Sequence, residues 1–104
     1  MIRSFTHKGL RDFFEQGKMR GLNPQWKNRL ERRLEILDAA QSIEDLDIPG
    51  WRLHQLKGDR AGYYSIELTA NWRLTFRAVE AENASEAGLE KDLDISEVNL
   101  EDYH

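Results

Sequence analysis

The polar residues best suited to chemistry gather in one stretch of this sequence, LHQLKGDRAGYYSIELTANWRLTF, which spans residues 53–76. His54, Lys57, Arg60 and Arg73 lie here among aromatic residues, although the chain has a net charge of −4. Cations that face phosphates and rings on which unstacked bases can lie are typical of surfaces that bind single-stranded RNA. RNA cleavage also needs a base for the 2′-hydroxyl, cations for the charge on the pentavalent phosphate, and an acid for the leaving oxygen. Tyr, His, Asp, Lys and Arg side chains can fill these roles without a metal.

Each of these residues also has an ordinary structural interpretation. An arginine on a sheet face is usually solvated or paired, and Glu67 can form a cross-strand ion pair with Arg73 worth roughly 0.2–1 kcal/mol. His54 can be a half-buried strand residue, and residues 102–104 can be a frayed terminus. The 3 histidines are not spaced as metal ligands, so we expect no metal site.

Length and composition indicate one small domain over residues 1–104. The absence of cysteine excludes disulfides and thiol chemistry and is compatible with a reducing compartment, so a cytoplasmic protein is expected. No stretch approaches the roughly 20 apolar residues of a membrane span. The charge is uneven, because residues 1–77 hold 14 Lys and Arg against 10 Asp and Glu, whereas residues 78–104 hold 1 Lys against 9 Asp and Glu. The basic part suits a polyanion, and the acidic part can equally be a solvated tail.

Two helices are predicted before Pro49-Gly50. The first covers His7 to Gln16, where Leu10, Phe13 and Phe14 share a face before Gly17 ends the helix. The second begins at Asn23-Pro24, because Asn caps free amides and Pro suits the first helical position, and apolar residues recur at helical spacing until about Ala40.

After Gly50 the apolar period changes to two, which predicts strands. The apolar sets of the two central strands share a face only if Leu68 lies opposite Trp72, which leaves a three-residue loop in which Asn71 suits a left-handed backbone. This register predicts a polar face turned away from the helices, made of Tyr63, Ser65, Glu67, Arg73, Thr75 and Arg77. Residues 80–92 are polar without a period and predict an extended hairpin loop or a disordered insert before a last strand over residues 93–100.

The runs LHQLKGDRAGYYSI, NWRLTF and EDYH resemble the HigB toxins of the RelE/ParE toxin superfamily. The opening MIRSFTHKGL and the segment LDAAQSIEDL are similar too, so the resemblance covers the chain except the polar segment around residues 80–92. It implies a RelE-like α+β fold with two N-terminal helices on one face of a small antiparallel sheet and RNA on the other face. The implied activity is that of a ribosome-dependent mRNA endonuclease without a cofactor, acting at the A site of the small subunit. The implied partner is a HigA-type helix-turn-helix antitoxin, through which alone the toxin meets operator DNA.

The matched motifs imply a set of site residues. The candidate catalytic residues are His54, Lys57, Arg73, Asp102, Tyr103 and His104. Arg73 and Lys57 are assigned to charge stabilisation, whereas the proton-transfer roles of the other four are not apportioned. The candidate RNA-binding residues are Arg60, Tyr63, Asn71 and Arg77.

The chain departs from many relatives of this family at Glu67 and Thr69, where those relatives carry an arginine near one of these positions. A carboxylate at position 67 that competes for Arg73 would reduce the nuclease activity. Two alternatives therefore stay open: a ParE-like gyrase inhibitor on the same fold, and an inactive toxin that acts only as a corepressor with its antitoxin. The antitoxin contact is also open, because Arg29, Arg32 and Arg33 form either a surface for an acidic partner or a solvated helix face.

Overall fold

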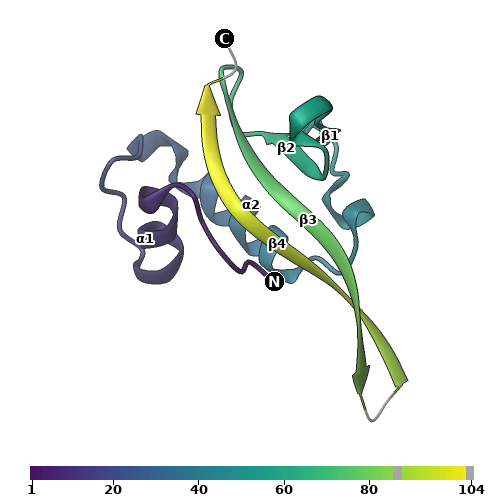
Figure 1. Ribbon diagram of the computed structural model, residues 1–104. Helices are drawn as coiled ribbons and strands as arrows, with labels where there is room; N and C mark the ends of the chain where they lie inside the picture. The colour runs from purple at the N-terminus through teal and green to yellow at the C-terminus, as the bar shows by residue number, and fades with distance from the viewer. Residues whose placement is uncertain (86–87, 103–104) are drawn as a thin grey trace.

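The structure is a computed structural model that describes the backbone of residues 1–85 and 88–102 and the side chains of residues 1–81 and 92–102. Its antiparallel sheet has the order β1-β2-β3-β4. The strands are β1 (His54–Gln55), β2 (Tyr63–Glu67), β3 (Trp72–Ser85) and β4 (Gly88–Asp102). Helices α1 (Lys8–Gln16) and α2 (Lys27–Ala39) lie on one side of this sheet (Figure 1). The α+β arrangement predicted from the sequence is confirmed.

Both helices start and end at the residues that the sequence indicates. His7 caps α1, since its Nδ1 accepts a hydrogen bond from the Leu10 amide at 3.2 Å, and Gly17 ends the helix with a left-handed backbone at φ 72°. Asn23 accepts a bond from the Gln25 amide at 2.9 Å and opens η1 (Pro24–Trp26), which leads directly into α2. A second short helix, η2 (Ile43–Leu46), follows α2 and carries the capping box of Ser42 and Asp45.

The register of β2 against β3 is the predicted one. The Leu68 amide donates to the Trp72 carbonyl at 2.9 Å, and Glu67 lies opposite Arg73. The loop between them does not use a left-handed Asn71, so that expectation is wrong. The hydroxyl of Thr69 instead accepts bonds from the amides of Asn71 and Trp72, at 3.3 and 3.2 Å, and closes the loop through a side chain.

Strands β3 and β4 form a long hairpin. Their ladder pairs residues 72–85 with 88–102, so residues 80–85 and 88–92 continue the strands, and the loop or disordered insert expected there is wrong for these residues. Figure 1 shows the far end of this hairpin extending past the helices. A bulge interrupts the ladder where Glu97 and Val98 lie opposite the single residue Phe76, and Glu97 adopts φ 55° there. The bulge changes which residues of β4 face the core.

The chain start covers the outer edge of β4. Ile2 and Phe5 form isolated parallel bridges to Ile95 and Val98. The Ser4 hydroxyl also accepts a bond from the Glu97 amide at 2.9 Å. An edge strand with free amides invites pairing with other chains, and this segment removes that possibility along the middle of β4.

The core lies between the helices and the apolar face of the sheet. Its fully buried members come from α1, α2, η2, β2, β3 and β4 and include Leu10, Leu30, Leu34, Leu37, Leu46, Ile66, Leu74, Phe76, Leu93, Ile95 and Val98. Burial of a Leu, Ile or Phe side chain contributes about 1.5–3 kcal/mol, so this layer fixes the sheet against the helices. Within the described residues, no helix is long and apolar enough to cross a bilayer.

Candidate functional site

The face of the sheet turned away from the helices is polar, as the register requires. Across the strands, His54, Ser65, Thr75 and Asn99 form one row, and Glu67, Arg73 and Glu101 form the next. Neighbouring rows lie on the same face because side chains two positions apart along a strand point the same way. The strands therefore bring residues from β1 to β4 onto one surface.

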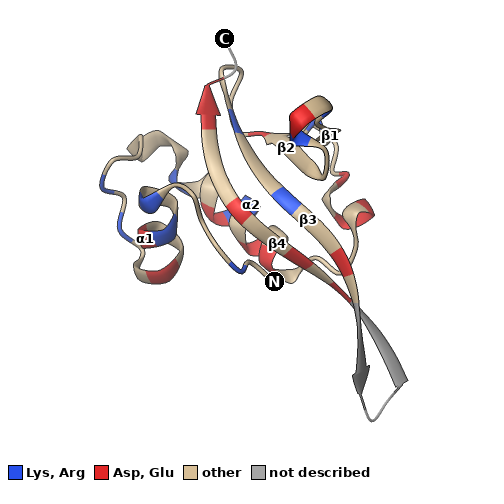
Figure 2. Ribbon diagram, in the orientation of Figure 1, with Lys and Arg blue, Asp and Glu red and all other residues tan. Residues whose placement is uncertain are grey.

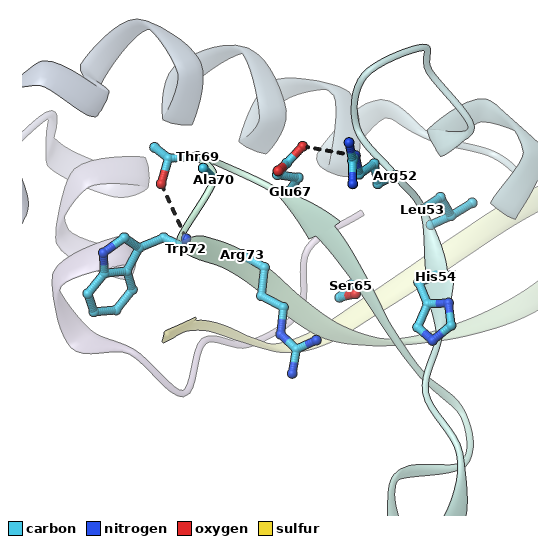
Figure 3. Close-up of a pocket in the computed structure, with 9 residues that line it drawn as sticks. All are labelled: Arg52, Leu53, His54, Ser65, Glu67, Thr69, Ala70, Trp72 and Arg73. Carbon is cyan, nitrogen blue, oxygen red and sulfur yellow. Dashed lines mark hydrogen bonds and ion pairs between the residues drawn. The ribbon is translucent and has the colours of Figure 1, made fainter. Parts of the chain in front are cut away.

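Two candidate catalytic residues line the same hollow on this face. It encloses about 320 Å³ and is bounded by residues 52–54 on one side and by Trp72 and Arg73 on the other. Figure 3 shows the His54 ring and the Arg73 guanidinium pointing to the same side of the sheet, with Ser65 between them. This hollow can place a proton-transfer group and a fixed cation around one substrate group.

Glu67 also lines this hollow, but its carboxylate forms its ion pair with Arg52, at 3.6 Å. Figure 3 shows this carboxylate turned toward Arg52, and the Arg73 guanidinium extending in another direction. Arg52 is 82% exposed, so solvent screens the pair strongly. Glu67 is thus the cross-strand neighbour of Arg73, but the Glu67 carboxylate points toward Arg52.

The other candidate residues that the structure describes do not line this hollow. Lys57 is exposed in the turn that follows β1, and Asn71 is exposed in the β2–β3 loop. Arg77 is exposed on β3 opposite Tyr63, and Asp102 lies opposite Trp72 where β4 ends. Tyr103 and His104 lie outside the described residues.

Arg60 and Tyr63 line a second hollow, of about 280 Å³, on the same face. Arg60 ends η3 (Gly58–Arg60) and binds the Glu101 carboxylate with both terminal nitrogens, at 2.9 and 2.5 Å. Glu101 also accepts a bond from the Thr75 hydroxyl. The Tyr63 hydroxyl donates to Glu97 at 2.7 Å, and the Arg60 guanidinium lies 5.8 Å from the centre of the Tyr63 ring. Both residues expected to contact RNA thus have partners on β4 in this structure.

These bonds set the protonation of the groups that make them. The hydrogen bond from Arg60 lowers the pKa of Glu101, and the bond from Thr75 and the charge of Arg73 act in the same direction. The same Glu101 bond raises the pKa of Arg60. The bond to Glu97 raises the pKa of Tyr63, which keeps this phenol protonated and unsuited to act as a base. Glu101 is therefore ionised at neutral pH, beside Arg60 and opposite Arg73.

The acidic C-terminal part of the chain forms a strand of the sheet, because residues 88–102 are β4. Figure 2 shows acidic residues along β4 beside the basic residues of β3. The solvated tail considered from the sequence is wrong for residues 88–102, which pair with β3 along their length. The charge asymmetry of the sequence brings opposite charges together on adjacent strands.

The sequence argument missed Glu97, Glu101 and Arg52. A signal for the first two was present: Leu93 and Ile95 alternate, but the next buried residue is Val98 rather than residue 97. A three-residue step in a two-residue period indicates a bulge, and it places Asn99 and Glu101 on the polar face. Nothing in the sequence pattern pointed to Arg52 as the partner of Glu67.

The comparison with protein-family models decides the family. The model described as the RelE-like toxin of the type II toxin-antitoxin system HigB matches residues 3–91 of this chain. The chain belongs to the HigB-like toxin family. The resemblance recognised in the KGDR, NWR and terminal DYH motifs is thereby confirmed.

Two curated HigB proteins are similar to this chain. The Proteus vulgaris protein named Endoribonuclease HigB is 41% identical over 104 residues and covers 100% of both chains. The Vibrio cholerae serotype O1 protein named Toxin HigB-1 is 43% identical over 82 residues, which cover 77% of this chain and 86% of the other.

Among solved structures, the YoeB/ParE toxin from Agrobacterium tumefaciens superposes with a TM-score of 0.53. The superposition covers 99% of this chain and 96% of the Agrobacterium tumefaciens chain, and the two sequences are 15% identical. At that identity the likeness concerns the fold alone, and it agrees with the predicted RelE-like arrangement. The HigB-like assignment thus rests on sequence, and the fold supports it.

Proposed function

We propose that this HigB-like toxin is an endoribonuclease that cleaves mRNA on the ribosome, at the A site of the small subunit. The observation that carries the proposal is the hollow that His54 and Arg73 line together on the polar face. The identity of 41% with a protein named Endoribonuclease HigB supports the same activity. The protein would act in the cytoplasm, where its substrate is found.

The chemistry follows from the charges that develop during cleavage. Attack by the 2′-hydroxyl builds negative charge on the phosphate, and fixed cations near it lower the barrier. Arg73 and Lys57 would supply this stabilisation. Proton transfer to and from the two oxygens would involve His54, Asp102, Tyr103 and His104, and Asn71 and Arg77 would contact the flanking RNA.

A toxin of this family works with an antitoxin, and we propose a HigA-type helix-turn-helix protein as the partner. Operator DNA would be contacted by the antitoxin. Of the three α2 arginines considered for the contact, Arg33 already donates to the Glu67 carbonyl at 2.8 Å and Arg29 to the Leu68 carbonyl at 3.4 Å. Arg32 is exposed and is therefore the best placed of the three for an acidic partner.

Inducible expression in bacteria tests the proposed function. Expression of the wild-type protein should arrest growth and produce new mRNA 5′ ends whose positions are in frame with the codons. Arg73→Ala should slow cleavage by about 10²–10³-fold, because it removes one fixed charge donor from the transition state. Arg11→Ala, which removes an exposed arginine on α1, should leave cleavage unchanged. Both variants should still bind the antitoxin, since neither residue contributes to the buried core.

The other outcomes identify the alternatives. Growth arrest by wild type without new mRNA ends would indicate a non-nuclease target such as gyrase. No arrest, with operator repression intact, would indicate an inactive toxin that serves as a corepressor. Equal cleavage by wild type and Arg73→Ala would remove Arg73 from the site.

A further inference from the structure

One carboxylate, that of Glu101, connects three segments of the polar face. It binds Arg60 of η3 at 2.9 and 2.5 Å, accepts a bond from Thr75 of β3, and itself belongs to β4. Glu101 also lies opposite Arg73 in the β3–β4 ladder. Each of these segments carries a candidate catalytic residue or directly adjoins one: Lys57 precedes η3, Arg73 is on β3, and Asp102 follows Glu101.

The turn that carries Lys57 has few other attachments. Strand β1 has only 2 residues, and η3 contributes no buried residue to the core. Most backbone bonds of the turn are local, such as the bond from the Arg60 amide to the Lys57 carbonyl at 3.4 Å and that from the Leu56 amide to the Tyr63 carbonyl at 2.9 Å. One bond reaches β3, from the Ala78 amide to the Gly62 carbonyl at 3.3 Å, at the end of the turn away from Lys57. A segment with few buried apolar contacts opens at low cost unless something else holds it.

The Arg60–Glu101 bridge supplies that attachment. A bidentate arginine–carboxylate pair fixes both distance and orientation, because two parallel bonds join two planar groups. The bridge also lies over Thr75, which is only 1% exposed although it belongs to the polar face. The bridge therefore ties the turn to the far strand of the sheet, 41 positions away in sequence.

A carboxylate at this place would otherwise oppose the proposed function, because it repels RNA phosphates. Its charge is compensated by Arg60, and the nearby charge of Arg73 acts on it in the same direction. A neutral side chain would not repel RNA phosphates, but it could not bind an arginine through two charge-assisted hydrogen bonds. The geometric role therefore accounts for a carboxylate at this position, beside the candidate cations of the site.

We propose that Glu101 is a positioning residue of the nuclease site, which holds Arg60 and thereby fixes the turn carrying Lys57 relative to Arg73. This inference rests on the proposed endoribonuclease function. Two cations can act on one phosphate only if the segments that carry them keep a fixed separation. A misplacement of about 1 Å in such a site can cost about 10²-fold in rate.

Single-turnover cleavage of mRNA on purified ribosomes, at increasing toxin concentration, tests this role because it separates the maximal rate from the half-saturating concentration. Glu101→Gln is nearly isosteric and should lower the maximal rate by about 10- to 100-fold. The half-saturating concentration should change by less than about threefold, since RNA contacts elsewhere on the face remain. The matched control is Asp94→Asn, which removes another β4 carboxylate paired with an arginine, Arg3, at 2.9 Å, and should behave as wild type.

A double-mutant cycle shows whether Glu101 acts through Arg60. If Glu101 acts only through Arg60, the double variant Arg60→Ala with Glu101→Ala should cleave no more slowly than the slower of the two single variants. Thermal unfolding and antitoxin binding of each variant check that the fold is retained, and near-isosteric Glu101→Gln carries the test if an alanine variant does not fold.

Several results would overturn the inference. A Glu101→Gln protein with the wild-type maximal rate would do so, as would losses that add in the double variant. Faster cleavage by Glu101→Gln would assign Glu101 to repulsion of RNA instead. A wild type that cleaves nothing would overturn the proposed function, and the positioning role with it, whereas a cleaving wild type with an unaffected Glu101→Gln variant would overturn the positioning role alone.

Discussion

The side chain of Arg33 links α2 to the end of β2 and to Trp51, which precedes β1. Its removal should measurably lower the stability of the fold. Its Nε donates to the Glu67 carbonyl at 2.8 Å, and its guanidinium lies 4.9 Å from the centre of the Trp51 ring. Trp51 is only 4% exposed, and its carbonyl accepts a bond from the Glu67 amide at 2.6 Å. Arg33→Ala would remove all the contacts of this arginine at once.

The expected loss follows from these contacts. A hydrogen bond to a charged donor contributes about 1.5–3 kcal/mol, and a partly desolvated cation over a ring about 0.5–2 kcal/mol. Burial and the neighbouring charges of Arg29 and Arg32 offset part of this stabilisation, because both disfavour the charged guanidinium and lower the pKa of Arg33. We therefore expect a net loss of about 2 kcal/mol in the free energy of unfolding. For a chain of this size that corresponds to a fall of about 10 °C in Tm.

Thermal unfolding followed by circular dichroism, without antitoxin, measures this loss. The matched control is Arg32→Ala, because Arg32 is an exposed arginine on the same helix and its removal should cost less than about 0.5 kcal/mol. Arg33→Lys should fall between wild type and Arg33→Ala, since it keeps the charge but loses the planar fork. Equal Tm values for Arg33→Ala and Arg32→Ala would refute the assignment of a structural role to Arg33.

Two further measurements test other features of the structure. Because the bond to Arg60 lowers the pKa of Glu101 in the folded state, the bridge should stabilise the fold above about pH 4.5 and lose this effect as the pH falls through the lowered value. The difference of about 1 kcal/mol in unfolding free energy between wild type and Glu101→Gln at pH 7 should therefore shrink in denaturant titrations as the pH falls through the lowered pKa of Glu101, and a difference independent of pH would contradict the linkage. Arg52 has φ 50°, so Arg52→Gly should be more stable than Arg52→Ala by about 1 kcal/mol, and the reverse order would show that this backbone is not strained.

The sequence predicted the parts of the fold that depend on short-range patterns. The two helices follow from apolar spacing, from the cap at Asn23 and from the helix end at Gly17, all of which act within a few residues. The pairing of Leu68 with Trp72 follows because a register shifted by one residue would bury Arg73 or expose Leu74. Such arguments need only the local order of polar and apolar residues.

Features that depend on distant partners escaped prediction. Arg60 was expected to contact RNA, but its observed partner, Glu101, is 41 positions away and comes from the acidic segment. The left-handed backbone was expected at Asn71 and occurs instead at Arg52 and Glu97, because tertiary contacts rather than residue preference set these conformations. The polar face was therefore predicted from the sequence, while the bonds that arrange its side chains were not foreseen.

The edge contact between the chain start and β4 affects how the protein folds during synthesis. The bond between Ser4 and the Glu97 amide joins residues 93 positions apart, so Ser4 lacks this partner until Glu97 has been synthesised. At about 5–20 residues per second, this wait lasts roughly 5–20 s. The polar face likewise lacks its fourth strand and Glu101 over this interval. A nascent chain therefore carries its helices early but acquires the assembled site only once β4 has been synthesised, which delays any activity until that point.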